Sequence, residues 1–222
     1  MVAIPFPTSS APGAVPNETC GRLINAFAEP IQTSPPSVII KRAPGLARLA
    51  DEPAEGHTRA LHLSGDKVIV VYDDTIYALS HNGDGTFSTA SLGSLTGDDL
   101  VTIAQNNADP NPNIVAVTND GVFNLFTNAP PSSFADGDLP APNSVAVLGG
   151  YLLFTTGDGK VYSTDLNAVT VDGLAFSTTP GNLIRGVAVN DSYFAFGASF
   201  CVIYRDAGLQ PFPLQPVTTI QK

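Results

Sequence analysis

A pattern of short apolar segments recurs four times between residues 57 and 208 and restricts what this chain can fold into. The starts of the first segment are 41, 44 and 42 residues apart, at Ala60, Val101, Val145 and Val187. A second segment starts at Lys67, Asn113, Tyr151 and Tyr193, and a third at Thr75, Gly121, Lys160 and Cys201. Three independent positions keep one register, which indicates a structural repeat.

A period of roughly 40 to 45 residues with several short strands is typical of a β-propeller blade. The sequence therefore predicts an all-β fold, a β-propeller with at least four blade-like repeats that is incomplete in this chain. A β-sandwich with coincidental spacing is the alternative. The middle segment of each unit is nearly all apolar, as in a strand that is covered on both faces. Tyr77, Phe123 and Tyr162 occupy equivalent places in the third segment, and we expect them to be buried.

Turn signals separate the segments and define three regions. Asn119-Asp120-Gly121 and Gly157-Asp158-Gly159 favour hairpins, because Asn, Asp and Gly tolerate positive φ. A fourth strand is expected in two units, over residues 85–90 and 173–177. We expect residues 1–56 to form an extended arm and an irregular β or linker segment, and residues 57–208 to form the four repeats. Residues 209–222 are interpreted as a Pro-rich connection that leads to residues not present.

Charge and cysteine content exclude several classes of function. The net charge is −10, and the acidic residues lie mainly in the repeats. We therefore do not expect a surface that binds the phosphates of nucleic acid. An acidic propeller could still surround DNA without binding it, but we interpret the net negative charge as keeping the protein soluble. Cys20 and Cys201 form no CxxC pair, and Cys201 is interpreted as a small buried apolar residue. The sequence contains neither a signal-like start nor a run of transmembrane length.

The sequence offers no set of residues for metal or nucleophilic catalysis. His57, His62 and His81 pair with no other side chain at zinc-ligand spacing, and there is no Gly-x-Ser-x-Gly elbow. We therefore predict no catalytic, metal-binding or cofactor-binding residues and no enzymatic activity. Residues 80–87, Ser-His-Asn-Gly-Asp-Gly-Thr-Phe, are interpreted as a tight polar hairpin, with a calcium site as the alternative.

Two alternative functions fit a propeller. A propeller glycosidase needs two carboxylates across a central pocket, for which the candidates are Asp98, Asp99, Asp136, Asp138 and Asp165. The absence of Trp argues against a carbohydrate site, because such sites usually present aromatic platforms. The other alternative is a non-viral propeller that serves as a protein-binding platform.

The residues before and within the repeats resemble a known family. The order is Leu23-Ile24-Asn25-x-Phe27-x-Glu29, a β-branched run at 37–42, and Pro44-Gly45-Leu46. The third repeat adds Tyr151 and then Ser163-x-Asp165-Leu166-Asn167. Over residues 20–208 the chain resembles the packaged-DNA stabilisation proteins of short-tailed bacteriophages, also called tail hub or nozzle proteins. The matching positions are structural.

This resemblance implies assembly and not catalysis. It implies a structural virion protein in a homo-oligomeric ring, a hexamer, below the portal and its adaptor. Its partners would be the portal-side adaptor protein and tail fibre or spike proteins. Packaged double-stranded DNA would pass through the ring without sequence-specific binding. The resemblance places the protein in the virion tail, assembled in the host cytoplasm, with no cofactor and no membrane anchor.

Overall fold

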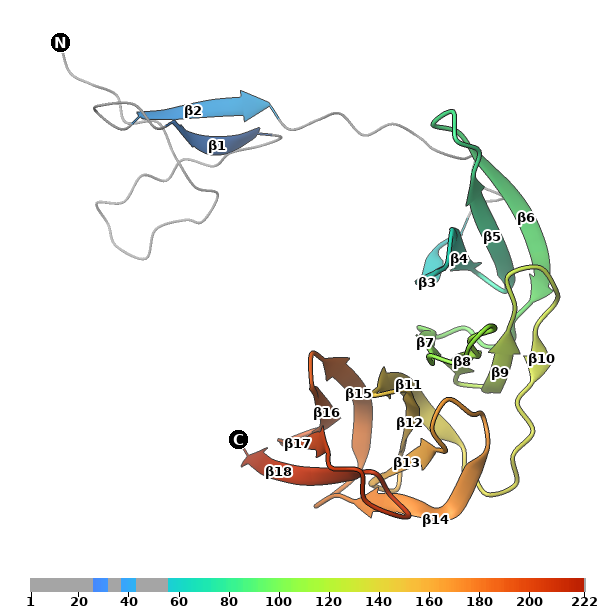
Figure 1. Cartoon of the computed structure of the whole chain (residues 1–222), viewed down its shortest axis with the longest axis vertical. Coiled ribbons are helices and arrows are strands. Elements are labelled where there is room, and N and C mark those ends of the chain that lie inside the picture. Colours follow the sequence, from blue (N-terminus) through green and yellow to red (C-terminus); the bar gives the residue numbers. More distant parts are fainter. Residues whose placement is uncertain (1–25, 32–36, 43–55, 222) are drawn as a thin grey trace. The chain divides into compact units, whose positions relative to one another are not determined.

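The computed structural model describes residues 26–31, 37–42 and 56–221 (Figure 1). The chain divides into two units, residues 1–49 and 50–222, and each is described by itself. All regular elements in the described ranges are β-strands. The described residues accordingly contain no helix that could span a membrane.

The first unit contains a hairpin. Strand β1 (Ala26–Ile31) pairs antiparallel with β2 (Ser37–Arg42), from Ala26 opposite Arg42 to Ile31 opposite Ser37. The β-branched run that the sequence marks as a short β segment is β2. Phe27 and Glu29 lie in β1. The other expected motif residues of this region lie outside the described residues: Leu23, Ile24, Asn25, Pro44, Gly45 and Leu46.

The second unit contains four antiparallel sheets, each made of four consecutive strands. We call them blades 1 to 4. Blade 1 has β3 (Thr58–Ser64), β4 (Lys67–Tyr72), β5 (Thr75–His81) and β6 (Phe87–Ser94). Blade 2 has β7 (Thr102–Gln105), β8 (Ile114–Thr118), β9 (Gly121–Leu125) and β10 (Ser132–Ser133). Blade 3 has β11 (Pro142–Leu148), β12 (Tyr151–Thr156), β13 (Lys160–Thr164) and β14 (Val171–Thr178). Blade 4 has β15 (Leu183–Val189), β16 (Ser192–Gly197), β17 (Phe200–Asp206) and β18 (Leu214–Gln221).

The predicted fold class is confirmed. The three repeated segments are the first three strands of each blade, and the expected fourth strands are β6 and β14. Packing joins β3 to β7, β7 to β11 and β11 to β15, whereas blade 4 does not meet blade 1 to close a ring. The described part of the chain is therefore an all-β, incomplete propeller (Figure 1).

Two outer strands differ from expectation. Residues 209–222 were expected to be a Pro-rich connection, but Leu214–Gln221 of this stretch is β18. Pro216 fits because it pairs with Tyr204 beside a register shift on an outer strand, where a missing N–H is tolerated. The other unexpected strand, β10, has two exposed serines. Neither strand has the apolar alternation that predicts a strand from sequence.

The burial of the second strands shows which blades have neighbours. Every residue of β8 is buried, and in β12 all but the first are. In β4 and β16 buried residues alternate with partly or fully exposed ones. Apolar clusters form between blades 1 and 2, blades 2 and 3, and blades 3 and 4. Blades 2 and 3 are thus covered on both faces and blades 1 and 4 on one.

The three equivalent aromatic residues confirm the repeat register but not their expected burial. Tyr77 lies opposite Val70, Phe123 opposite Ala116, and Tyr162 opposite Phe154, at matching places in their blades. Tyr162 is 4% exposed, whereas Tyr77 and Phe123 are half-buried. Tyr77 stays accessible because it lies on the face of blade 1 that no other blade covers. Phe123 packs at the margin of the cluster between blades 1 and 2.

Phe154 provides a test of this packing. Its side chain is fully buried between blades 2 and 3 and lies beside Phe134, with 5.8 Å between ring centroids. We expect Phe154→Ala to lower the free energy of unfolding by about 3–5 kcal/mol, because a large cavity opens in the core. Half-buried Phe123→Ala should cost less, and exposed Leu166→Ala less than about 0.5 kcal/mol. Urea unfolding measures all three, and equal losses would contradict the described burial.

Candidate functional site

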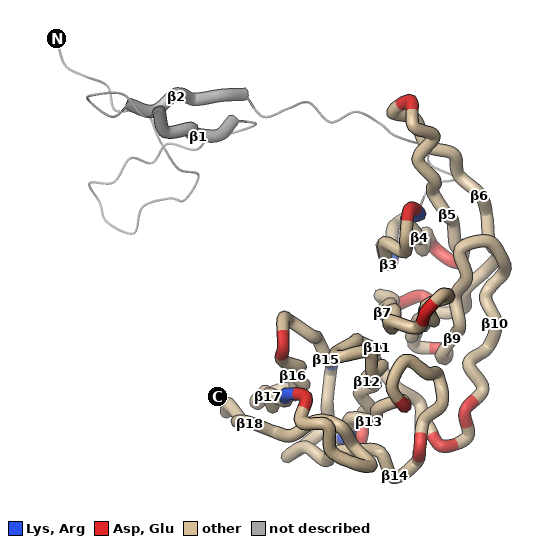
Figure 2. Tube along the Cα trace, viewed as in Figure 1, with Lys and Arg blue, Asp and Glu red and all other residues tan. Residues whose placement is uncertain are grey.

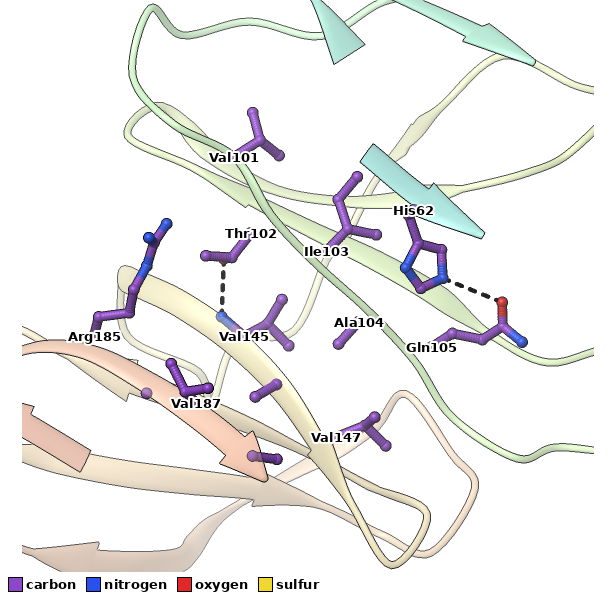
Figure 3. A pocket seen from close by; sticks show the side chains of 13 residues that line it. His62, Val101, Thr102, Ile103, Ala104, Gln105, Val145, Val147, Arg185 and Val187 are labelled. Atoms are coloured by element: carbon purple, nitrogen blue, oxygen red, sulfur yellow. Dashed lines mark hydrogen bonds between the residues drawn. The ribbon is translucent and has the colours of Figure 1, made fainter. Parts of the chain in front are cut away.

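A hollow lies between the first strands of the blades (Figure 3). Its volume is about 440 Å³. The residues that line it come from β3, the β7 region, β11 and β15: His62, residues 101–105, residues 145–147 and residues 185–188. In Figure 3 Arg185 and His62 lie at opposite ends of the hollow. The repeat brings these residues together because each blade contributes the same strand.

The lining of the hollow is mainly apolar. Most of its side chains are Val, Ala or Ile, and Arg185 is the one permanently charged residue among those that line it. The lining contains no carboxylate, no cysteine and no serine. It therefore offers an apolar surface with a single cation, and no acid and base pair for hydrolysis.

Hydrogen bonds tie the first strands of neighbouring blades together around the hollow. Each of the three blade pairs has at least one such bond that involves a side chain. His62 Nε2 donates to Gln105 Oε1 at 3.3 Å, the Val145 amide donates to Thr102 Oγ1 at 3.0 Å, and the Gly186 amide donates to Ser144 Oγ at 2.8 Å. These bonds fix the spacing of the strands that line the hollow.

The turn that follows β13 contains most of the third-repeat motif. Asn167 adopts a φ of 55°, and its amide donates to the Gly150 carbonyl at 3.0 Å. Its side-chain Oδ1 accepts from the Asn107 amide of blade 2 at 3.1 Å. The Asn167 carbonyl accepts from Asn113 Nδ2 at 3.4 Å. The turn of blade 3 is thus bonded to the loop between β7 and β8 of blade 2.

Asn106 organises the blade 2 side of this contact, and sequence reasoning missed it. The residue is 1% exposed. Its Oδ1 accepts from the Asn113 amide at 2.8 Å, and its Nδ2 donates to the Ala168 carbonyl at 3.2 Å. The available signal was an Asn directly after a strand and before a Pro-rich loop, a position where Asn side chains replace backbone hydrogen bonds.

The other motif residues of the third repeat occupy structural positions. Tyr151 begins β12 and is half-buried. Ser163 is buried in β13, and its Oγ has no hydrogen-bond partner among the described residues. Asp165 accepts from Thr170 Oγ1 at 3.4 Å, which closes the turn. Leu166 projects from the turn and is 57% exposed. The motif therefore shapes one exposed turn.

The histidines do not form a metal site in the described part of the chain. His57 lies beside Asp73, with 3.4 Å between Nδ1 and Oδ1. His62 lies in the hollow, and His81 contacts Phe87 edge to face with 5.1 Å between centroids. No group of three or more His, Cys, Asp or Glu residues within the described ranges could hold a metal ion.

Residues 80–87 form the tight polar hairpin that the sequence predicts. Asp84 Oδ1 accepts from the Thr86 amide at 2.9 Å and from Thr86 Oγ1 at 2.6 Å, and these bonds lower the pKa of Asp84. Asn82 Nδ2 donates to Thr86 Oγ1 at 2.9 Å. A calcium site would need the side-chain oxygen atoms of Asp84 and Thr86 as ligands, but these atoms form hydrogen bonds within the hairpin.

The five candidate carboxylates lie in connections between strands. Asp98 accepts from Asn119 Nδ2 at 2.7 Å. Asp136 accepts from the Asp138 amide at 3.0 Å and from the Val171 amide at 2.9 Å. None of the five, Asp98, Asp99, Asp136, Asp138 and Asp165, lines the hollow. The structure does not bring them together as a pair across it.

Cys201 is less buried than expected. It lies in β17 and is half-buried, and burial raises the pKa of its thiol. The side chain belongs to the face of blade 4 that no blade covers, which the sequence of the repeat alone does not reveal. Cys20 lies outside the described residues.

Comparison with known proteins gives matches in structure only. No family model and no curated protein matches the chain. The nidogen/laminin complex matches with 11% identity and a TM-score of 0.54, over 84% of this chain and 72% of that one. The BBS1 N-terminal domain in complex with ARL6 matches with 13% identity and a TM-score of 0.52, over 83% and 59%. The WD40 β-propeller domain of Doa1 matches with 11% identity and a TM-score of 0.51, over 76% and 55%.

These matches define the class of fold. The chain spans less than two thirds of the length of the BBS1 and Doa1 structures. At such low identity the likeness shows the fold alone. The chain is similar to β-propeller domains, in agreement with its four blades.

His62, which lines the hollow, makes the stability of the fold depend on pH. Burial lowers the pKa of His62 below its ordinary 6.5, and the bond to Gln105 opposes this in part. As the pH falls, the unfolded chain therefore binds a proton at His62 before the folded chain does. The contribution of neutral His62 to the free energy of unfolding is present above pH 6.5 and is lost as the pH falls through the lower folded-state pKa. Urea unfolding from pH 7.5 to 5 should show this loss, and His62→Gln should reduce it. The exposed His81→Gln variant should keep it; if His62→Gln keeps it too, the assignment is wrong.

Proposed function

We propose that this chain is a structural, non-enzymatic propeller component that binds other proteins. The observation that carries the proposal is the lining of the hollow, which is apolar with Arg185 as its single permanent cation. Such a surface suits a partner with an apolar segment and a nearby carboxylate. It has no pair of carboxylates to act on a glycan.

Two structural neighbours are consistent with this role. The BBS1 domain was solved in complex with ARL6, and nidogen in complex with laminin. Both structures are complexes of two proteins that contain a chain with a fold similar to this one. Their identities of 13% and 11% carry no function across by themselves, so the partner of this chain follows from its own surface.

A charge reversal in the hollow tests the proposal. Arg185→Glu removes the cation of the hollow, and Leu174→Glu adds the same carboxylate on the exposed outer strand β14 of blade 3. In affinity capture from the source cells with quantitative mass spectrometry, we expect Arg185→Glu to lose a specific partner at least about tenfold, or 1.4 kcal/mol. Leu174→Glu should retain it. A purified protein that hydrolyses glycans, or captures no partner, would contradict the proposal.

The sequence resemblance supports a narrower second proposal, that the assembly is the tail hub of a short-tailed bacteriophage. In this proposal the platform forms a hexameric ring in the virion and contacts the portal-side adaptor and the tail fibres or spikes. The motif turn from Ser163 to Asn167, on which part of the resemblance rests, bonds blade 3 to blade 2. Portal and terminase genes beside its gene, and the chain among the proteins of purified virions, would support it. Absence from virions would refute it.

The charge distribution predicts weak DNA binding. Residues 56–221 carry five Lys or Arg residues and fifteen Asp residues. Many of the Asp residues lie in turns (Figure 2). Arg59 is buried against the carbonyls of Asp73 and Asp99, Lys67 donates to a carbonyl, and Lys160 pairs with Asp158 at 3.1 Å. Of these five cations, Arg185 and Arg205 remain without such a partner.

We therefore expect little affinity for double-stranded DNA even at low salt, where phosphate contacts are strongest. Fluorescence anisotropy of a labelled duplex, titrated with the protein at low salt, measures it. Tight binding with a steep salt dependence would contradict the prediction and indicate a basic surface elsewhere in the protein.

A further inference from the structure

The loop between β5 and β6, residues 82–86, contains the one Asn-Gly pair of the sequence, Asn82-Gly83 (Figure 1). Every residue of this loop is exposed, and so is His81 before it. A Cβ built on Gly83 would meet no atom within 4 Å, so there is room beside this backbone for a new ring. Because glycine has no Cβ, its nitrogen is the least hindered one that can approach the side-chain carbon of a preceding Asn. Asn82 is therefore the side-chain amide of this chain that is most open to attack by its own backbone.

His81 places a basic nitrogen on the hydrogen atom of the attacking group. The Gly83 amide donates to His81 Nδ1 at 3.1 Å. A backbone N–H can only donate, so Nδ1 carries the lone pair of a neutral imidazole ring. The ring lies edge to face with Phe87, with 5.1 Å between ring centroids, and this contact holds its orientation. The Gly83 nitrogen must lose its hydrogen to act as a nucleophile, and a base already lies in contact with that hydrogen.

Thr86 holds Asn82 in place across the loop. The Asn82 amide donates to the Thr86 carbonyl at 3.0 Å, and Asn82 Nδ2 donates to Thr86 Oγ1 at 2.9 Å. These two bonds fix both the backbone and the side chain of Asn82. The loop therefore keeps the side-chain amide, the Gly83 nitrogen and the base together in one short exposed segment.

The neighbouring Asp84-Gly85 pair lacks this arrangement. The side chain and the amide of Thr86 both donate to Asp84 Oδ1, at 2.6 Å and 2.9 Å, and these bonds lower the pKa of Asp84. The side chain of Asp84 is thus held as a carboxylate, which is a poorer electrophile than a neutral amide. The same loop accordingly contains one reactive pair and one protected pair.

We propose that Asn82-Gly83 is a site of spontaneous deamidation and that His81 is its general base. His81 Nδ1 takes the hydrogen of the Gly83 amide, and a bond forms between Gly83 N and Asn82 Cγ. The bond between Cγ and Nδ2 of Asn82 breaks, and Nδ2 leaves as ammonia with the proton that His81 returns. The product is a five-membered succinimide. Water then adds to one of its two carbonyl carbons and opens the ring to an aspartate or an isoaspartate.

The modified loop would lose the bond that now holds residue 82. Thr86 Oγ1 has a single hydrogen, which it already donates to Asp84. A carboxylate at position 82 can donate nothing to Thr86 Oγ1, and it adds a second negative charge beside Asp84. Deamidation therefore places a permanent charge on one exposed loop of blade 1 and loosens that loop. This modification goes beyond the binding role proposed above and does not depend on what the hollow binds.

Peptide mapping by mass spectrometry tests the proposal on the folded 222-residue protein, incubated at neutral pH in water enriched in heavy oxygen. We expect Asn82 to lose its amide and to give both aspartyl and isoaspartyl peptides that carry the label. Exposed Asn128, which precedes Ala129, is the internal comparison and should keep its amide over the same time. Asp84-Gly85 should give no isoaspartyl product.

His81→Gln separates a base from a mere hydrogen-bond acceptor. Its side-chain oxygen can still accept from the Gly83 amide but cannot take the proton. We expect this variant to lose the Asn82 amide at least about tenfold more slowly, since general bases contribute roughly 100-fold or more to rates. His57→Gln, at another exposed histidine, is the matched control and should react like the unaltered chain. In urea His81→Gln and the unaltered chain should react at the same rate, because unfolding separates His81 from Gly83.

Three results would overturn the proposal. The first is an Asn82 amide that is lost no faster than that of Asn128. The second is a folded His81→Gln protein that reacts as fast as the unaltered chain or faster, since the contact would then protect the Gly83 amide or have no effect. The third is an equal slowing of His81→Gln in urea, which would assign the effect to the neighbouring sequence and not to the folded loop.

Discussion

Burial of one sheet face by the next sheet is the interaction on which the rest of this structure depends. A four-stranded blade has two apolar faces and cannot cover either by itself. Where neighbours are present on both sides, as for β8 and β12, the strand is buried along its length. Where one neighbour is missing, as for β4 and β16, burial alternates. The same sequence pattern therefore produces core in the middle of the array and accessible apolar surface at its ends.

The hollow follows from the same packing. Because each blade contributes its first strand at the same place, residues more than 120 positions apart, such as His62 and Arg185, line one cavity. The hydrogen bonds between first strands join neighbouring blades around the hollow. Position in the repeat, and not a local motif, determines which side chains reach the hollow. A binding surface built in this way can change its chemistry at one strand without loss of the fold.

Local pattern was sufficient to predict the twelve strands that make up the first three positions of the blades, because each has apolar residues between turn-forming ones. It did not predict β10 and β18, whose residues are mostly polar and exposed. The partial burial of Tyr77 and Cys201 depends on which blade has a neighbour, a property of the array that no segment contains. The contact of Asn106 and Asn113 with the turn at Asn167 joins residues far apart in sequence, so no local window could reveal it.

A hydrogen bond of Asn106 within blade 2 also explains how this blade accommodates a longer connection than the others. Three of the blades connect their first two strands by a tight turn, whereas blade 2 uses residues 106–113. Asn106 closes this longer loop with its side chain, bonding across its base to the Asn113 amide. The strands on either side pair in register from Gln105 opposite Ile114 to Thr102 opposite Val117. A side-chain clasp of this kind separates the length of a repeat from its geometry, so that residues can be added in the loop without shifting the blades that follow.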